Sequence, residues 1–590
     1  MYHLITSFLA EKRKKRSGCL FMFVPMKFDN GNHCAKDQGD YYSNNIMNTS
    51  SQPYHDSGME ISDPSRPSLD GETWTKGEQQ PRKFNDVAFG ILFYLHLIGM
   101  AACAGVYAPQ MFSEMANIAA DGGGGERGLL DSSASNNKEL VTSRLMSWAV
   151  GATQHIFSSS STALLSSNRR VLEEENNADN NESGINDFDD LLLLLSISAI
   201  VAGIISTLAL GVMIRHARKM IIFALVFNIF AALVFTIGAF FVSPFAAIMG
   251  VLLLAFNAYF AYVVWGRIPF AACNLATATT AVKANLGLSF VGYSSLVSMF
   301  CWSAFWLVSA VPTIYITSGC DAEAGACENE ANGLVVFLLL VSYYWTYQVI
   351  QNTVHVTVAG VVGTWWYVPT EASSFCSRSI GESYFRSLTY SFGSICLGSL
   401  IVAIVESLVT MVRNMRESGD GGGVFLCIAE CLLALLRDII EYFNRWAFTY
   451  VGVYGYSFIE AGKNVTTLFK SRGWTTIITD SLAQSVLTLV SVGVGLITAI
   501  ICLIISYSRG MVFGDELGAS SAAFFIGFTT GLVLTTTLLS LVSAAVNTVI
   551  VCYADAPSEF RVNHPKLSDD MQEGWATAWP EQFRYPSSFR

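Results

Sequence analysis

The chain has 590 residues, of which 52% are hydrophobic and only 14% are charged, and its formal net charge is −11. A soluble protein carries about 25% charged residues, so this composition excludes an ordinary soluble enzyme or binding domain. Apolar runs that can cross a hydrocarbon layer about 30 Å thick, each of about 20 residues, recur along the chain. The sequence therefore predicts an all-α, polytopic integral membrane protein that contacts lipid, and the charge in its loops and tails does not indicate a nucleic-acid partner.

The first 86 residues are polar and rich in Ser, Asn, Asp and Gly, unlike the rest of the chain. Segments of low hydrophobicity cannot bury enough apolar surface to offset the entropy lost on folding. We therefore expect residues 1–86 to be a disordered cytosolic tail. The short apolar stretch near Met1 precedes the basic cluster at 11–16, which is the reverse of the order in a secretory signal peptide.

Ten apolar segments follow, and they define a membrane domain over residues 87–556. A long polar loop at 109–190 separates the first segment from the second, and it is expected outside the cytosol. The expected spans are 87–108, 191–214, 220–242, 244–265, 290–312, 333–366, 388–411, one span within 424–458, 482–505 and 522–546.

Lys and Arg near the ends of the spans predict the orientation, because they stay on the cytosolic side. Basic clusters precede the first span, separate the second from the third at 215–219, and follow the eighth at 463–472. The loop at 320–330 holds four acidic residues and no basic one. With an even number of spans, both termini are expected in the cytosol, with residues 557–590 as a C-terminal tail.

The segment around the eighth span fits this orientation least well. Arg413 and Arg416 precede it and would lie outside, and the stretch 429–452 carries five charged residues. For part of this stretch the alternative is an amphipathic helix that lies in the interface without crossing.

Two covalent features are expected on the outer side. Asn181 begins an N-x-S sequon in the long first loop, which predicts glycosylation. Cys320 and Cys327 share one short acidic loop and are placed for a disulfide if that loop faces an oxidising compartment. The cysteines form no CxxC pair and no cluster with His, so no metal site and no cofactor are predicted.

Ionisable side chains inside a span are costly in lipid and therefore indicate function. Spans two to five and ten have none, whereas His96 lies in the first span, His355 in the sixth and Glu406 in the seventh. On the sixth span, residues spaced by three or four form one helical face that is aromatic at both ends and polar in the middle. This face consists of Tyr344, Gln348, Asn352, His355, Ala359, Gly363 and Trp366.

Two interpretations of that face remain open. It lines a path for a solute, or it makes interhelical hydrogen bonds and packs closely through Gly360 and Gly363. Glu406 has two interpretations as well, because it is about 30 Å of helix from Arg386 and so lies towards the outer interface. It serves the solute path, or it is a solvated acid at the end of a helix that pairs with Arg413.

Aromatic side chains are 13% of the chain. Trp365, Trp366 and Tyr367 are expected to be anchors at the membrane interface, where most membrane Trp and Tyr residues lie. Trp302 and Trp306 lie deeper in the fifth span and one turn apart. Aromatic faces of this kind hold a quaternary ammonium group, each with about 0.5–2 kcal/mol.

Several longer segments resemble signature segments of the eukaryotic choline transporter-like family. They are QNTVHVTVAGVVGTWWY at 351–367, SFGSICLGSLIVAIVE at 391–406, FNRWAFTYVGVYGYSFIEAGK at 443–463, VCYADAPSEFRVNHP at 551–565, and the expected cytosolic loop at 266–287. The similarity extends in order from Val87 to Pro565.

The resemblance implies ten spans, cytosolic termini and carriage of choline or a related small amine, in some members in exchange for protons. On this hypothesis the substrate contacts Trp302, Trp306, Tyr344, Gln348, Asn352, His355 and Glu406. Proton coupling is assigned to His355, whose imidazole titrates near neutral pH, and to Glu406. The membrane is expected to be the plasma membrane, with an internal membrane as the alternative, and the oligomeric state is left open.

The main alternative is a lipid-handling or channel-like protein of the same architecture, without saturable carrier activity. An intramembrane enzyme is not expected, because the chain has no G-x-S-G tetrapeptide and no phosphate-binding loop. A purely structural scaffold would not explain why an ionisable side chain, His355, lies inside a span.

Overall fold

The computed structural model describes most of the chain from residue 83 to residue 578, all within one compact unit, Lys76–Arg590. The described residues are 83–121, 183–241, 243–318, 320–321, 326–327, 332–417, 423–471, 482–509 and 516–578. The expected N-terminal tail and most of the first loop, with the sequon at Asn181, lie outside them.

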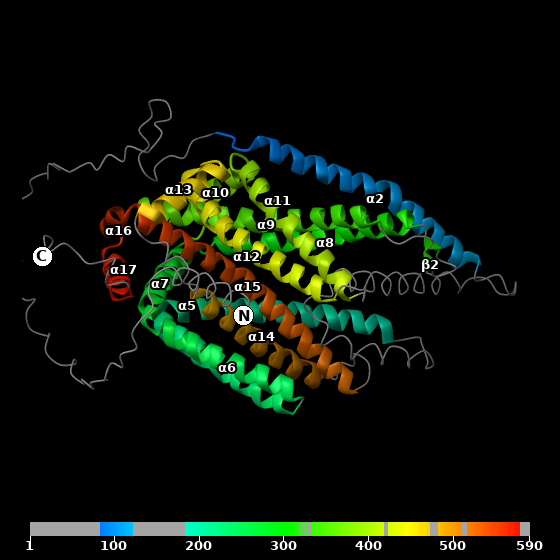
Figure 1. Ribbon diagram of the computed structural model, residues 1–590, viewed down its shortest axis with the longest axis horizontal. Helices are drawn as coiled ribbons and strands as arrows, with labels where there is room; N and C mark the ends of the chain where they lie inside the picture. The colour runs from blue at the N-terminus through cyan, green and yellow to red at the C-terminus, as the bar shows by residue number, and fades with distance from the viewer. Residues whose placement is uncertain are drawn as a thin grey trace, which may run out of the picture. The chain divides into compact units, whose positions relative to one another are not determined.

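Long helices form a bundle, as Figure 1 shows. They are α2 (Val87–Asp121), α5 (Ser183–Phe240), α6 (Pro244–Val264), α8 (Leu288–Thr317), α9 (Gly333–Tyr367), α11 (Phe392–Glu417), α12 (Gly423–Tyr454), α14 (Leu482–Arg509) and α15 (Glu516–Asp555). Shorter elements connect or cap them. These are the 3-10 turn η1 (Trp265–Arg267), α7 (Ile268–Ala284), β1 (Cys320–Asp321), β2 (Ala326–Cys327), α10 (Arg378–Leu388), α13 (Phe458–Ser471), α16 (Pro557–Asn563) and α17 (Pro565–Ala578).

Within the described residues, eight helical stretches are long and apolar enough to cross a membrane. One of them, Leu193–Phe240 in α5, has 48 residues. At 1.5 Å per residue it is about 72 Å long, more than twice the thickness of the hydrocarbon layer. Its backbone leaves helical geometry at His216 (φ −131°, ψ 27°), inside the basic cluster expected between two spans. The protein is therefore an all-α polytopic membrane protein, and α5 supplies two of the ten expected segments.

α12 is not one of the eight apolar stretches, because charged residues recur along it. It is nevertheless one continuous helix of 32 residues, and it packs along α9, α11 and α15. This packing favours a helix that runs along the bundle over one that lies flat in the interface. Counted with the two parts of α5, α12 completes the ten segments expected from the sequence.

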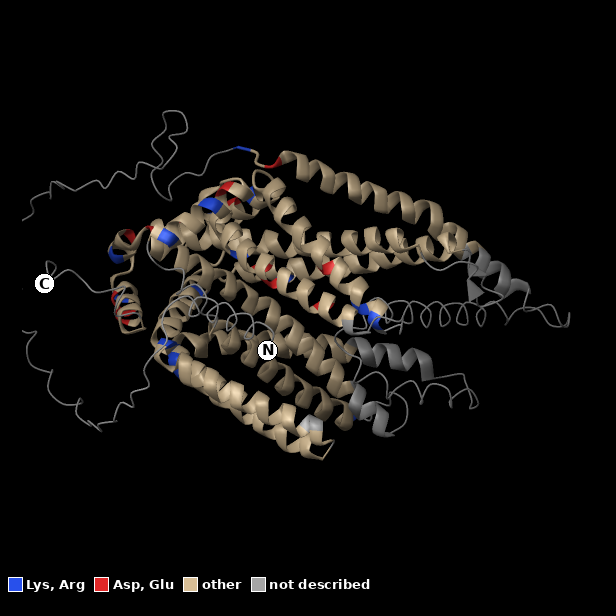
Figure 2. Ribbon diagram, viewed as in Figure 1, with Lys and Arg blue, Asp and Glu red and all other residues tan. Residues whose placement is uncertain are grey.

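The structure also differs from the sequence interpretation at two connecting segments. The expected loop at 266–287 is mostly helical, because α7 begins with Pro269 in its first turn, a position that proline favours. The first part of the expected C-terminal tail forms α16 and α17, which pack on α9 and α7. Figure 2 shows charged residues around the end where α7, α10, α13, α16 and α17 lie, and a second group along α11 and α12.

The two short strands pair antiparallel, with Cys320 opposite Cys327. Opposite residues in such a pair have Cα atoms about 4.5–5.5 Å apart, within the range of about 4.4–6.8 Å that a disulfide spans. We therefore predict that Cys320 and Cys327 form a disulfide in the mature protein. A peptide that contains both should accept two alkylating groups only after reduction, whereas double alkylation without reduction would contradict the prediction.

Candidate functional site

α9 lies at the centre of the bundle and packs against α8, α10, α11, α12, α15 and α16. Its start is fixed by Asn332, whose side-chain oxygen accepts from the N–H of Leu334 at 3.0 Å, an N-cap that satisfies one of the free donors of the first turn. The polar face expected on this helix therefore lies inside the protein.

The polar face of α9 contacts α11 through Tyr344 and Asn352. The Tyr344 hydroxyl lies 2.9 Å from Thr410 Oγ1 on α11. Because Thr410 donates its own proton to the carbonyl oxygen of Glu406, at 2.9 Å, Tyr344 is the donor in the first bond. About two turns further along the face, Asn352 donates to Ser399 Oγ at 3.0 Å.

The same face contacts α12 at His355. His355 Nε2 lies 3.0 Å from Thr449 Oγ1, and Thr449 donates to the carbonyl oxygen of Arg445 at 2.8 Å. The threonine proton is thus in use, so His355 donates from Nε2. We refer to the contact zone of these three helices as the polar seam. It comprises Tyr344, Gln348, Asn352 and His355 of α9, Ser399, Glu406 and Thr410 of α11, and Arg437, Asp438, Glu441 and Thr449 of α12.

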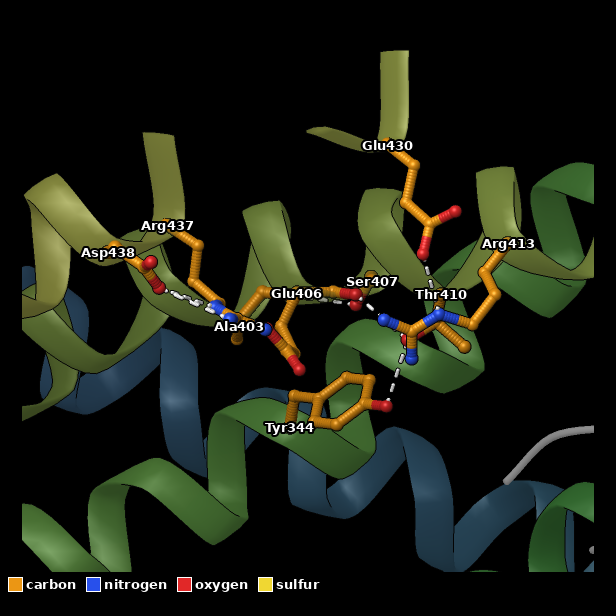
Figure 3. Close-up of polar contacts among 9 residues, drawn as sticks. All are labelled: Tyr344, Ala403, Glu406, Ser407, Thr410, Arg413, Glu430, Arg437 and Asp438. Atoms are coloured by element: carbon orange, nitrogen blue, oxygen red, sulfur yellow. Dashed lines mark hydrogen bonds and ion pairs between the residues drawn. The ribbon is translucent and has the colours of Figure 1, made fainter. Parts of the chain in front are cut away.

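Charged groups of α11 and α12 pair across the seam, as Figure 3 shows. Glu406 Oε2 lies 3.2 Å from Arg437 Nη1, and Arg437 Nη2 lies 3.1 Å from Asp438 Oδ1. The alternative pairing of Glu406 with Arg413 is wrong. Arg413 instead contacts Glu430 at 2.9 Å, a carboxylate that also pairs with Arg416 at 2.9 Å.

The charges of α12 face the interior of the bundle. At about 100° per residue, Glu430, Arg437 and Glu441 lie on the side of the helix opposite its exposed apolar stripe. Asn444, on the interior side, is buried and donates to the carbonyl oxygen of Gly398 on α11 at 2.8 Å. The exposed stripe consists of Phe425, Ile428, Leu432, Leu436, Ile439 and Phe443.

The two tryptophans of α8 do not join this seam. Trp302 and Trp306 are buried, and their indole N–H groups donate to the carbonyl oxygens of Tyr343 (3.3 Å) and Leu339 (2.9 Å). The ring of Trp306 packs edge-on against Tyr343, 5.1 Å between centroids, whereas the next residue, Tyr344, turns towards α11. The expected site residues therefore form two groups on different sides of α9.

His96 of α2 belongs to the group that contains Trp302 and Trp306. Its Nδ1 donates to the carbonyl oxygen of Phe93 at 2.8 Å, which leaves Nε2 to accept from Ser342 Oγ at 3.1 Å. Its ring lies 4.9 Å from Trp345 and 6.1 Å from Trp302. The sequence singles out this histidine but gives no signal for Ser342, Trp345 and Trp302, which lie about 200 to 250 residues away.

Small residues bring α9 and α12 into direct contact beyond His355, towards the end of α9. A Cβ atom on Gly452 would lie 2.6 Å from both Ala359 Cβ and the carbonyl oxygen of Val356. A Cβ on Gly360 would lie 2.8 Å from Ser383 Oγ and 3.3 Å from the carbonyl oxygen of Gly452. The close-packing interpretation of Gly360 is therefore correct, alongside the polar contacts.

We expect Gly452→Ala to destabilise the protein, because the added methyl group overlaps atoms of α9. Such an overlap in a packed interior lowers the free energy of unfolding by about 1–3 kcal/mol. Gly493→Ala is the matched control, because no atom lies within 4 Å of its added Cβ and alanine favours helix. The melting midpoints of the two detergent-solubilised variants test this. Equal midpoints would mean that α9 and α12 separate freely at this point.

The aromatic end of α9 is covered by protein. Trp365, Trp366 and Tyr367 are 3%, 0% and 9% exposed, so the expectation that they are interface anchors is wrong. Trp366 stacks on Phe560 of α16 with centroids 3.8 Å apart and donates to the carbonyl oxygen of Ala556 at 3.0 Å. We refer to α16 and α17 as the C-terminal cap.

Side chains of the cap satisfy the carbonyl groups at the end of α9. Asn563 donates to the carbonyl oxygens of Trp366 and Tyr367, at 2.9 and 2.8 Å, which have no partners within a helix terminus. His564 stacks on the Trp365 ring at 4.0 Å and donates to its carbonyl oxygen at 3.1 Å. Burial lowers the pKa of His564, and the hydrogen bond to Trp365 opposes this.

The fold and the seam define a polytopic membrane protein with a polar, partly charged layer inside an apolar bundle. The family model for the plasma-membrane choline transporter matches residues 248–558, more than half of the chain. The chain belongs to this family.

Three relatives show the extent of the similarity. Protein PNS1 of Gibberella zeae is 29% identical over 341 residues, 55% of this chain and 62% of that protein. Protein PNS1 of Debaryomyces hansenii is 27% identical over 392 residues, 63% of this chain and 75% of that protein. A CTL-like protein of Dictyostelium discoideum is 31% identical over 306 residues, 51% of each chain. The chain thus matches between about half and three quarters of these relatives' lengths.

Proposed function

We propose that this protein carries choline or a related small ammonium solute across a membrane, along the polar seam between α9, α11 and α12. The observation that carries this proposal is the seam itself. Its hydroxyl, amide, imidazole and carboxylate groups face one another inside an otherwise apolar bundle, where each ionisable group is costly unless it serves a path or a partner. Membership of the plasma-membrane choline transporter family supports the same conclusion.

Within this proposal, Tyr344, Gln348, Asn352, His355 and Glu406 line the path. His355 and Glu406 are proposed to take part in proton exchange, if transport is coupled to protons. Trp302 and Trp306 donate to the backbone of α9, so their proposed contribution is to hold α8 against α9 beside the path. Lipids and the small cation are the proposed partners.

The proposed orientation places both termini in the cytosol, at the end of the bundle where α7, α10, α13, α16 and α17 lie. Charged residues gather there, as Figure 2 shows, and basic residues near span ends remain cytosolic. The strands with Cys320 and Cys327 would then face the outside. We propose the plasma membrane as the host, with an internal membrane as the alternative.

Uptake of labelled choline tests the function in cells that lack their own choline carriers and express this chain at their surface. We expect saturable uptake that unlabelled choline blocks and that depends on external pH. Asn352→Leu should abolish most of it, because it removes the amide bonded to Ser399. Asn257→Leu is the matched control, since Asn257 of α6 donates to the carbonyl oxygen of Leu253 on its own helix.

Absence of uptake by a surface-localised wild type would contradict the proposal. An ion current, or lipid scrambling without saturable uptake, would favour the channel-like or lipid-handling alternative.

A further inference from the structure

The middle of the polar seam carries more negative than positive charge. Three carboxylates, Glu406, Asp438 and Glu441, face two guanidinium groups, Arg437 and Arg445, so the formal charge of the group is −1. Asp438 lies halfway along α12, which extends from residue 423 to 454. An unmatched charge at this depth costs several kcal/mol in an apolar surrounding.

The two guanidinium groups are already engaged. Arg437 binds Glu406 and Asp438, at 3.2 and 3.1 Å. The guanidinium carbon of Arg445 lies 5.4 Å from the centroid of the Tyr442 ring, a cation–π arrangement. Glu441 is attracted by Arg437 and Arg445, but among the described residues its carboxylate has no direct hydrogen bond or ion pair.

A second and independent observation lies beside it. Asp438 is only 6% exposed, and while its Oδ1 binds Arg437, its Oδ2 is buried without a hydrogen-bond partner among the described residues. Leaving such an oxygen unsatisfied costs about 1–3 kcal/mol, and more when the group is charged. The cluster is thus incomplete in charge and in hydrogen bonding at the same place.

The chemistry of the neighbouring groups indicates which cation completes it. Across the described part of the chain, no three His, Cys, Asp or Glu side chains converge as metal ligands do. The ring of Tyr344 lies beside the cluster, because its hydroxyl binds Thr410, which in turn donates to the carbonyl oxygen of Glu406. A quaternary ammonium group donates no N–H bond and is held by a counter-charge and ring faces, which matches this set.

We propose that the ammonium group of the transported solute is held at this cluster, with the Glu441 carboxylate as its counter-charge and Arg437 as the residue that positions Glu406 and Asp438 around it. This inference rests on the proposed function and goes beyond it, because it names the residue that recognises the charge. It also assigns the recognition to α12, whose carboxylates were not among the residues expected to bind substrate.

The test compares choline with the neutral alcohol in which a carbon atom replaces the ammonium nitrogen, each as an inhibitor of labelled choline uptake. Wild type should prefer choline strongly. Glu441→Gln should reduce that preference at least about tenfold, which corresponds to about 1.4 kcal/mol, and Glu441→Asp should restore part of it. Glu382→Gln is the matched control, since the side chain of Glu382 is 56% exposed and pairs with Arg378 on its own helix.

A merely structural role for Glu441 would lower uptake of choline without changing the preference for it over the neutral alcohol, and that result would overturn the inference. Loss of pH dependence with the preference intact would make the cluster a proton site and would overturn it too. If Glu441→Gln fails to reach the surface, a Glu441→Asp protein with an unchanged KM for choline contradicts it. Absence of uptake by the wild type refutes the proposed function and this inference together, whereas normal wild-type uptake with an unaltered variant refutes only the inference.

Discussion

Arg437→Gln should yield less folded protein than the double replacement of Glu406 and Arg437 by Gln. The single change leaves the carboxylates of Glu406 and Asp438 without their shared guanidinium inside the bundle, and breaking a fully buried ion pair costs about 3–5 kcal/mol. Because the side chains of Glu406 and Arg437 are each 25% exposed, we expect Arg437→Gln to lower the free energy of unfolding by about 2–3 kcal/mol. The double change removes one of the stranded charges and should recover part of this loss, measured as the melting midpoint of the solubilised protein.

Arg378→Gln is the control for the loss of a guanidinium. Arg378 pairs with Glu382 at 2.6 Å, but its side chain is 87% exposed, and pairs of this kind contribute little. The wild type, both single variants and the double variant form a cycle that isolates the coupling between Glu406 and Arg437. Strictly additive losses would show that the two residues act independently, contrary to the structure.

The polar face of α9 could be predicted from the sequence because its residues recur with the period of a helix. Tyr344, Asn352 and His355 lie on one side of any straight helix. Their partners could not be predicted, since Ser399 and Thr449 are 47 and 94 residues away. Nothing in the local pattern of α11 or α12 distinguishes those two hydroxyl groups from the others there.

The charged residues of α12 show a second reason why the structure could not be predicted from the sequence. A stretch with five charged residues has the pattern of an interfacial helix, and the pattern indeed has two faces. The sequence does not show that the charged face of α12 packs against polar groups of α9 and α11, among them Glu406. The helix therefore crosses the bundle with Arg437 turned inward.

Tryptophan at the end of a span is usually an interface anchor, and this rule failed for Trp366. The side chain is fully buried because Ala556 and Phe560, about 190 residues later, return to cover it. A short polar segment after the last span is typical of a tail, and only its contacts show that it is part of the fold.

The C-terminal cap leads to the second large effect, on Trp366→Ala. The indole ring is 0% exposed, it stacks on Phe560, and its N–H satisfies the carbonyl oxygen of Ala556. Truncation of a buried tryptophan costs about 3–5 kcal/mol. We expect a marked fall in the melting midpoint, together with faster amide exchange in α16 and α17, because the ring joins the end of α9 to the residues that begin the cap.

Two further variants separate the contributions of the ring and the N–H group. Trp366→Phe keeps a ring against Phe560 but loses the bond to Ala556 and part of the buried ring volume, so it should cost at least about 1–2 kcal/mol and less than Trp366→Ala. Trp265→Ala removes an indole that is 54% exposed and should change the midpoint by less than about 0.5 kcal/mol. If Trp366→Ala melts like Trp265→Ala and its cap exchanges as slowly as in wild type, α16 and α17 are held by their other contacts, namely the bonds of Asn563 and His564 to α9 and the packing on α7 and α15. In that case the stacking of Trp366 on Phe560 is not what joins the cap to α9.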